Sequence, residues 1–346
     1  MAILPCILAF AIEFTPLQLA GAVIAVLFVA WLSLKLLLPT RRVGDYHNKY
    51  VLVTGCDSGF GRGLVIRLDG MGFHVFGACL TQQGKRDLEQ TCSKRTVGLL
   101  MDVTSHEQIV EAFEQVKRVL PSGTGLWAVY NNAGFMTLAP LEWFPLDDYK
   151  RMADVNLWGL VDVTKTFLPL VKMARGRVVN VSSIAGIVVV PSMAAYSITK
   201  YGVEAFSDAL RREMSPWGVR VIIIEPGGFK TPLWDEQKIV KNYNDLWERL
   251  SHELKEDYGE TFRARGIEAL QEYYRESSPF THKVIDTAVD ALTLRDPQPR
   301  YQVNLQALKC AALSVLPTKL ADAILVKMEK SKVMPSGVEQ QKGRTA

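Results

Sequence analysis

Short apolar runs alternate with longer amphipathic stretches along the middle of this chain of 346 residues. Helices are predicted near residues 59–72, 106–119, 148–173 and 195–214. The apolar runs predict strands: "KYVLVTG" (49–55), "HVFGACL" (74–80), "TVGLLMDV" (96–103), "LWAVYNNAG" (126–134), "GRVVNVSS" (176–183), "VRVIIIEPGG" (219–228) and a last one near "RYQVN" (300–304). Strands that alternate with helices of about ten or more residues predict an α/β fold, with a doubly wound parallel sheet and helices on both faces.

Two segments depart from this alternation within and after the predicted catalytic domain, residues 43–304. The block at about 234–276 is charged and helical, and Ile239, Tyr243 and Leu246 recur at helical spacing along one face. Its place before the last strand suits a cover over a pocket, or simple packing on the body. The segment 305–346 has two apolar stretches separated by Pro317, which suit membrane contact or a packed terminal helix.

The amino-terminal segment, residues 1–42, predicts a membrane anchor. Residues 16–34 are apolar apart from Gln18 and Ser33, and as a helix they would extend roughly 28 Å, close to the thickness of a bilayer core. Basic residues follow this run, whereas Glu13 precedes it. The positive-inside rule therefore predicts that the rest of the chain faces the cytosol. A cleaved signal peptide is less consistent with the sequence, because the basic region that would begin one is missing.

Composition excludes several other classes of function. The net charge is only +4, and no long basic run is interleaved with aromatic residues, so nucleic-acid binding is not expected. The five cysteines and five histidines have no metal-ligand spacing, so no metal is expected. Scattered, odd-numbered cysteines are typical of reduced thiols in a cytosol-facing domain.

A glycine-rich turn joins the first predicted strand to its helix. Gly55, Gly59 and Gly61 follow the strand directly, as "TGCDSGFG". Glycines let the backbone approach a pyrophosphate, whose charge is then met by N–H groups at the start of the helix. The turn therefore predicts a dinucleotide site.

The chain resembles the short-chain dehydrogenase/reductase family through several motifs in order. They are "TGCDSGFG" (54–61), Asp102 after the third strand, "NNAG" (131–134), Asn156 in "DVNLWG", "VSS" ending at Ser183, Tyr196-x-x-x-Lys200 and "EPGGFKT" (225–231). The resemblance covers residues 50–232 and implies a Rossmann-type fold. It makes a catalytic role for Tyr196 and Lys200 far more convincing than their i,i+4 spacing alone, which is common on solvated helix faces.

The resemblance implies a role for each matching residue. Tyr196 would be the acid–base group, with its pKa lowered from about 10 by the charge of Lys200 and of a bound oxidised nicotinamide. Ser183 would hold the reacting oxygen, and Asn156 would position a water that links Lys200 to solvent. The implied cofactor-binding residues are Gly55, Ser58, Gly59, Phe60, Gly61, Cys79, Asp102, Val103, Asn132, Ala133, Gly134, Tyr196, Lys200, Pro226, Gly227 and Thr231.

NAD is the expected cofactor, with NADP second. NAD-preferring members usually have an acid at the end of the second strand, and Cys79 followed by Leu80 stands there instead. An NADP site needs a basic residue for the 2′-phosphate, however, and neither Ser58 nor Leu80 supplies one. Asp57 would also repel a phosphate if it points that way.

The quoted segments resemble a membrane-linked branch of the family that includes retinol dehydrogenases, membrane-bound 17β-hydroxysteroid dehydrogenases and D-β-hydroxybutyrate dehydrogenase. The residues expected to bind substrate are Ser183, Met193, Phe229 and Trp234, with apolar neighbours Val188, Val189, Val190 and Leu233. This lining predicts oxidation of a lipophilic alcohol, a steroid or retinoid hydroxyl. Hydroxybutyrate oxidation is the alternative, and a non-catalytic dinucleotide-binding scaffold is a third hypothesis. The expected location is the endoplasmic reticulum membrane, with a mitochondrial membrane as the alternative and a homo-oligomer as a further option.

Overall fold

The computed structural model describes residues 21, 23, 26–27, 41–328 and 333–338. The chain divides into two units, residues 1–42 and 43–346. The predicted membrane span, residues 16–34, lies almost wholly outside the described residues. Within the described part of the chain, no helix combines the length and the apolar character needed to cross a bilayer.

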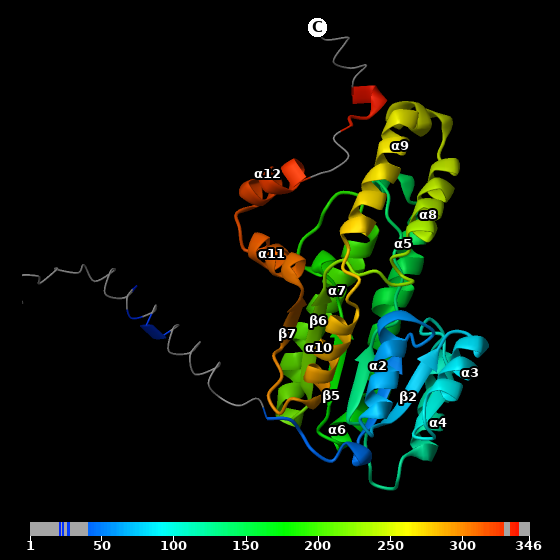
Figure 1. The fold of residues 1–346 in the computed structure, drawn as a ribbon, viewed down its shortest axis with the longest axis vertical. Helices are drawn as coiled ribbons and strands as arrows, with labels where there is room; N and C mark the ends of the chain where they lie inside the picture. Colours follow the sequence, from blue (N-terminus) through cyan, green and yellow to red (C-terminus); the bar gives the residue numbers. More distant parts are fainter. Residues whose placement is uncertain (1–20, 22, 24–25, 28–40, 329–332, 339–346) are drawn as a thin grey trace, which may run out of the picture. The chain divides into compact units, whose positions relative to one another are not determined.

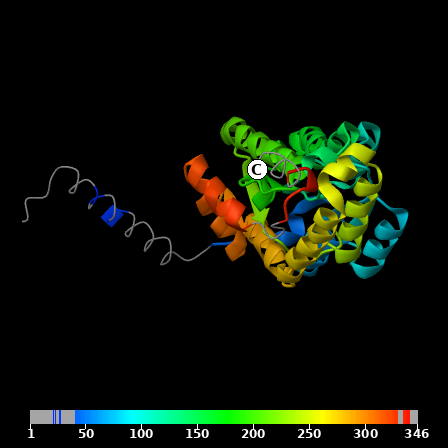
Figure 2. The same ribbon diagram turned by 90° about the horizontal axis from the view of Figure 1, so that it is seen from above.

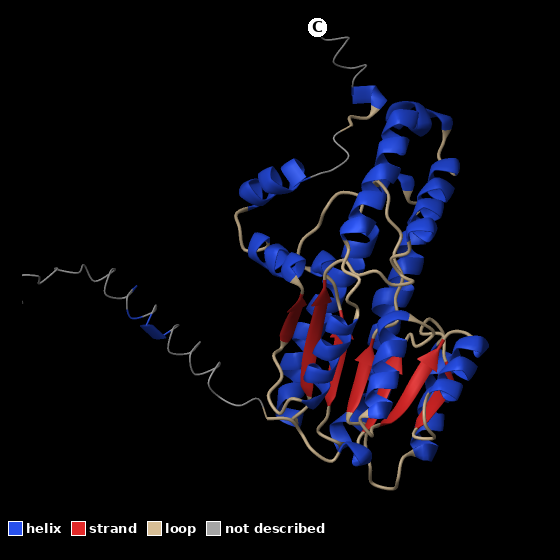
Figure 3. Cartoon of the chain, in the orientation of Figure 1, coloured by secondary structure: helices blue, strands red, loops and turns tan. Residues whose placement is uncertain are grey.

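The second unit is built on one seven-stranded sheet in the order β3-β2-β1-β4-β5-β6-β7. Every neighbouring pair of strands is parallel (Figure 3). The strands are β1 (Tyr50–Thr54), β2 (His74–Cys79), β3 (Thr96–Leu100), β4 (Ala128–Asn131), β5 (Arg177–Val181), β6 (Arg220–Pro226) and β7 (Arg300–Val303). The order reverses direction between β1 and β4, which is the switch point where ligands bind in such sheets. The predicted doubly wound α/β fold is therefore confirmed.

Two apolar cores cover the two faces of the sheet. The helices α2 (Gly59–Gly70), α3 (Gln82–Thr91) and α10 (His282–Thr293) contribute to one core, and α4 (His106–Val119), α6 (Leu160–Met173) and α7 (Ala194–Met214) to the other. Strands such as β1 are buried along their whole length because both faces are covered. The helices α3 and α10 were not predicted from the sequence.

The predicted helix over 148–173 is interrupted. It forms α5 (Leu146–Ala153), a π-helical turn (Asp154–Gly159) and α6, and short 3₁₀ turns lie at Tyr46–Asn48, Leu141–Trp143, Ile184–Gly186 and Ser215–Trp217. The π-helical turn carries Asn156, whose side chain is fully buried. Such turns occur often at functional sites because they redirect one side chain within a helix.

The block after β6 forms α8 (Glu236–Glu248) and α9 (His252–Glu276), which lie side by side beyond the carboxyl ends of the strands (Figures 1 and 2). As predicted, Ile239, Tyr243 and Leu246 form one buried face of α8. The helix α9 is kinked at Gly259, where φ is 79°. After β7 the chain forms α11 (Leu305–Leu313) and α12 (Thr318–Met328).

Candidate active site

The predicted dinucleotide turn lies between β1 and α2. Gly55 and Gly59 have φ of 69° and 60°, in the left-handed region that glycine adopts readily. A Cβ on Gly61 would lie 2.3 Å from the carbonyl oxygen of Gly55, so only glycine fits there. A Cβ added on Gly59 would make only ordinary van der Waals contacts, at 3.9 Å or more. Ser58 caps α2 without a side-chain bond, so its hydroxyl is available to a ligand.

The loops after β1 and β4 are tied together. The Thr54 hydroxyl accepts hydrogen bonds from the backbone N–H groups of Asn132 and Ala133, both at 3.0 Å. The Asn132 side chain donates to the carbonyls of Thr54 (2.9 Å) and Gly55 (3.1 Å). Thr54 was not among the predicted site residues, although it opens the quoted motif. It fixes the rim of the site at the switch point of the sheet.

The loop after β6 meets the same turn. The nearest atoms to an added Cβ on Gly59 belong to Pro232 and Thr231. Phe60 and Phe229 pack edge to face, with ring centroids 5.8 Å apart. A Cβ on Gly227 would lie 2.6 Å from the side chain of Asn304, so this loop is also held closely. The structure therefore brings the turn at 55–61 and the loop at 226–231 together.

Asp57 supplies a carboxylate at the end of β2. Its side chain accepts hydrogen bonds from the backbone N–H groups of Leu80 (2.8 Å) and Thr81 (3.0 Å) and from the Thr81 hydroxyl (2.6 Å). Cys79 is fully buried in the core, whereas Leu80 is exposed. No acidic residue stands at the end of β2 in the sequence, but the Asp57 carboxylate of the glycine-rich turn lies there in the structure.

Asp102 and Val103 lie after β3, as predicted. The Asp102 carboxylate accepts from the backbone N–H (2.9 Å) and hydroxyl (2.8 Å) of Thr104, and Val103 is buried in the core. Asp102 thus shapes its own loop through hydrogen bonds that the motif alone does not reveal.

The predicted acid–base residues converge at the start of α7. Tyr196 and Lys200 lie one turn apart and are 7% and 5% exposed. The Ser183 side chain lies near the Tyr196 hydroxyl and lowers its pKa in part. The Lys200 ammonium donates to the Val181 carbonyl at 2.9 Å and lies 5.6 Å from the centroid of the Tyr196 ring.

Burial dominates the pKa of Tyr196 in the chain alone. It raises this pKa to about 12, and the Ser183 side chain lowers it only in part. Burial also lowers the pKa of Lys200 to about 8, against the charge of Glu204. The expected lowering of the tyrosine pKa also requires the charge of a bound oxidised nicotinamide, which adds to that of Lys200. The chain alone holds Tyr196 as a phenol, which can donate a proton.

Asn156 anchors the site to α7. Its Oδ1 accepts from the Phe135 N–H (2.9 Å), and its Nδ2 donates to the Phe135 carbonyl (2.9 Å) and the Thr199 hydroxyl (3.2 Å). A Cβ on Gly134 would lie 3.0 Å from Asn156 Oδ1, so the "NNAG" loop passes close to this amide. Asn156 thereby fixes the loop against the helix that carries Tyr196 and Lys200.

Tyr196 belongs to a buried apolar and aromatic cluster. It includes Met193, Trp234, Leu138, Ala139, Trp143, Tyr243, Leu246 and Trp247. The rings of Trp143 and Trp247 lie 5.1 Å apart, which joins the loop after β4 to α8. Of the predicted substrate residues, Met193 and Trp234 belong to this cluster with Tyr196, whereas Phe229 packs in the core beside Phe60.

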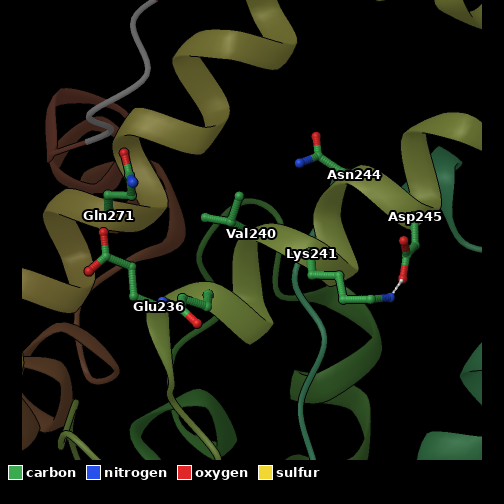
Figure 4. Close-up of a pocket in the computed structure, with 7 residues that line it drawn as sticks. Glu236, Val240, Lys241, Asn244, Asp245 and Gln271 are labelled. Carbon is green, nitrogen blue, oxygen red and sulfur yellow. Dashed lines mark hydrogen bonds and ion pairs between the residues drawn. The ribbon is translucent and has the colours of Figure 1, made fainter.

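A hollow of about 610 Å³ lies between α8 and α9, away from these residues (Figure 4). It is lined by Glu236, Gln237, Val240, Lys241, Asn244, Asp245 and Gln271. Lys241 pairs with Asp245 there at 2.5 Å. The hollow contains none of the predicted site residues.

Comparisons with known proteins agree with the motifs. Residues 49–241 match the short chain dehydrogenase family. The chain is 42% identical to retinol dehydrogenase 7 of Rattus norvegicus, over 85% of this chain and 93% of the relative. It is 42% identical to retinol dehydrogenase 16 of Homo sapiens, over 80% and 88% of the two chains. It is 41% identical to short-chain dehydrogenase/reductase family 9C member 7 of Homo sapiens, over 82% and 90%.

Solved structures share the fold. A short chain dehydrogenase/reductase from Burkholderia phymatum in complex with NAD has a TM-score of 0.66 at 18% identity, covering 78% of this chain and 94% of that one. A short chain dehydrogenase from Burkholderia cenocepacia J2315 in complex with NADP has a TM-score of 0.61 at 22% identity, covering 80% and 97%.

Proposed function

Because the chain belongs to the short-chain dehydrogenase/reductase family, whose members bind NAD(P), and is an oxidoreductase acting on CH–OH donors, we propose that it oxidises a lipophilic alcohol with NAD. The proposed substrate is a retinoid or steroid hydroxyl. The observation that carries the proposal is the apolar and aromatic cluster around Tyr196. The names of the retinol dehydrogenases similar to this chain favour the same substrate class.

The charges around this cluster support a neutral substrate. Three basic side chains in and between α8 and α9 are paired with carboxylates. Arg249 pairs with Asp148 at 2.8 Å, and Lys255 with Glu248 at 3.3 Å. Arg263 lies 3.2 Å from Glu260. A small carboxylate substrate such as hydroxybutyrate would have to compete with these pairs. An uncharged alcohol would instead gain from the apolar surface.

The residues of the glycine-rich turn fit a dinucleotide. The left-handed Gly55 and Gly59 and the Ser58 hydroxyl, which makes no cap hydrogen bond at the start of α2, suit a pyrophosphate. The fixed carboxylate of Asp57 at the end of β2 favours ribose hydroxyls over a 2′-phosphate, which supports NAD over NADP. When bound, the nicotinamide supplies the hydride chemistry.

The proton transfer that accompanies the reaction is carried out by residues of the chain itself. Ser183 holds the alcohol oxygen beside Tyr196, and the proton of the alcohol passes to the Tyr196 oxygen as the phenolate. The Lys200 ammonium stabilises that phenolate by its charge. In the reverse direction the Tyr196 phenol donates its proton to the alkoxide oxygen. The buried cluster excludes water from these groups.

The proposal includes a membrane location. The apolar residues 16–34 would anchor the chain in the endoplasmic reticulum membrane, with the catalytic unit facing the cytosol, since basic residues follow the run. A mitochondrial membrane is the alternative. A substrate that partitions into the bilayer suits such an anchor.

The test is NAD reduction by the full chain in lipid vesicles, with retinol, hydroxysteroids and D-β-hydroxybutyrate as separate substrates. We expect turnover on a retinoid or steroid that is at least about a thousandfold slower in Tyr196→Phe. Turnover on hydroxybutyrate alone would overturn the substrate class. Tight NAD binding with no turnover on any of these alcohols would favour a scaffold.

A further inference from the structure

A cluster of charged side chains lies behind the acid–base pair, where α7 packs on β6 and β7. The Arg300 guanidinium donates through Nη1 to Glu204 and to Glu225 (3.0 Å), and through Nη2 to Asp208 (2.8 Å). Gln302 also donates to Glu225. Glu204 is 8% exposed and Glu225 is fully buried. Buried carboxylates are retained only where they are paired and hydrogen-bonded.

This cluster reaches the catalytic lysine through Glu204. Glu204 follows Lys200 by one turn of α7, so the two side chains share a face of the helix. A Cβ on Gly186 would lie 2.7 Å from Ser182 Oγ, 3.0 Å from the Lys200 carbonyl and 3.1 Å from Glu204 Cγ. The loop after β5, which carries Ser183, is therefore pressed against the same stretch of helix.

The charges in the cluster are unbalanced. The Arg300 guanidinium faces the three carboxylates of Glu204, Asp208 and Glu225. Asp208 is also paired with Arg211 (3.2 Å) and Arg212 (3.4 Å), which leaves Glu204 and Glu225 to share Arg300. Lys200 is the buried cation on the same helix face as Glu204. Burial raises the pKa of Glu204, while contacts with Ser182 and Arg300 lower it, so the guanidinium helps to keep this carboxyl ionised.

We propose that Glu204 is a positioning residue that acts through Lys200: Arg300 holds its carboxylate in place, and its charge keeps the buried Lys200 ammonium protonated. The charge of Glu204 raises the pKa of Lys200 against the effect of burial, as this role requires. The proposal rests on the acid–base role of Lys200 in the proposed function. It extends that centre from α7 to β6 and β7.

Several polar and charged groups face Glu204, and their charges also affect the pKa values of Glu204 and Lys200. They are Lys200, Tyr201 and Asp208 on α7, Ser182 after β5, Glu225 on β6 and Arg300 on β7. Asp208 lies two turns from Lys200 and its side chain is 28% exposed, so its charge is better screened. It provides a matched control on the same guanidinium.

The direct test is the pKa of Lys200 in the full chain, from an NMR titration of ¹³C-labelled lysine side chains, with the signal assigned by its loss in Lys200→Met. We expect Glu204→Gln to lower this pKa by about one to two pH units, the effect of a charge about 6 Å away at an effective dielectric constant of about 20. Asp208→Asn should produce less than half of that shift. Glu204→Asp, which keeps the charge, should restore at least half of it.

An unchanged Lys200 pKa in Glu204→Gln, or an equal shift in Asp208→Asn, would overturn the proposal. If Glu204→Gln does not fold, Arg300→Gln serves as the second variant. It leaves Glu204 without its guanidinium, so the carboxyl takes up a proton and the Lys200 pKa should again fall; an unchanged value would refute the proposal. The titration needs no substrate, so the outcome of the alcohol assays is independent of it.

Discussion

Replacing Lys200 by methionine should raise the free energy of unfolding and, in the same variant, abolish activity. Burial lowers the pKa of Lys200 from 10.5 to about 8. At about 1.4 kcal/mol for each pH unit, holding the ammonium in this site costs about 3.5 kcal/mol near pH 7. Methionine avoids this cost and loses the hydrogen bond to the Val181 carbonyl, which contributes about 1 kcal/mol. The net expected gain in unfolding free energy is about 2.5 kcal/mol.

The gain should depend on pH in a defined direction. Because the pKa of Lys200 is lower in the folded protein than in the unfolded chain, the unfolded chain binds more protons between about pH 8 and 10.5. The free energy of unfolding of the protein with Lys200 therefore rises as the pH increases through that window. The difference in stability between Lys200→Met and this protein should disappear near the upper pH.

The assay is thermal unfolding of both proteins at pH 7 and at pH 9.5, combined with NAD reduction. We expect the midpoint of Lys200→Met to rise by roughly 2–5 °C at pH 7, with activity reduced by at least about a hundredfold. Lys165→Met is the matched control, since Lys165 is exposed on α6, and it should change the free energy of unfolding by less than about 0.5 kcal/mol. A Lys200→Met protein that is less stable at pH 7 would refute the reasoning, because Lys200 would then be a structural residue.

Three further predictions concern the rest of the site. Gly61→Ala should weaken NAD binding by at least about tenfold in a fluorescence titration, because the new Cβ would clash with the Gly55 carbonyl. Gly70→Ala is the control, since an added Cβ there has nothing within 4 Å. Equal binding in both variants would contradict the placement of the dinucleotide. Asp57→Asn should raise kcat/KM with NADP, relative to kcat/KM with NAD, by about tenfold, because the charge that opposes a 2′-phosphate is removed. An unchanged ratio would show that Asp57 does not select the cofactor. Trp143→Ala should lower the free energy of unfolding by about 3–5 kcal/mol in chemical denaturation, because this ring is 1% exposed and contacts Tyr243 and Trp247. A decrease below about 1 kcal/mol would mean that the packing of α8 does not depend on Trp143.

The sequence predicted every strand of the sheet, and strands buried on both faces such as β1 and β5 read as continuous apolar runs. The resemblance to the short-chain dehydrogenase/reductase family also placed Ser183, Tyr196 and Lys200 in one site. Interruption of the helix over 148–173 was not predicted, because a π-helical turn leaves the apolar spacing almost unchanged. The helices α3 and α10 were missed: α3 has few apolar residues, and buried Gly84 and Leu88 are its main contacts.

The parts of the site that could not be predicted depend on contacts distant in sequence. Asp57 reaches the end of β2 across 23 residues, and Arg300 reaches Glu204 across 96. The direction of the Lys200 side chain toward the Val181 carbonyl also depends on the packing of α7 on β5. The expected lowering of the Tyr196 pKa includes the charge of a bound oxidised nicotinamide and stays a prediction.

The most direct test of the central claim is a single turnover of bound NAD with the best alcohol of the panel, in the unchanged protein and in Tyr196→Phe. The account predicts that the variant binds NAD with a Kd within about threefold of the unchanged protein, yet forms NADH at least about a thousandfold more slowly. A variant that keeps more than about a tenth of the rate would contradict the assignment of Tyr196 as the acid–base group.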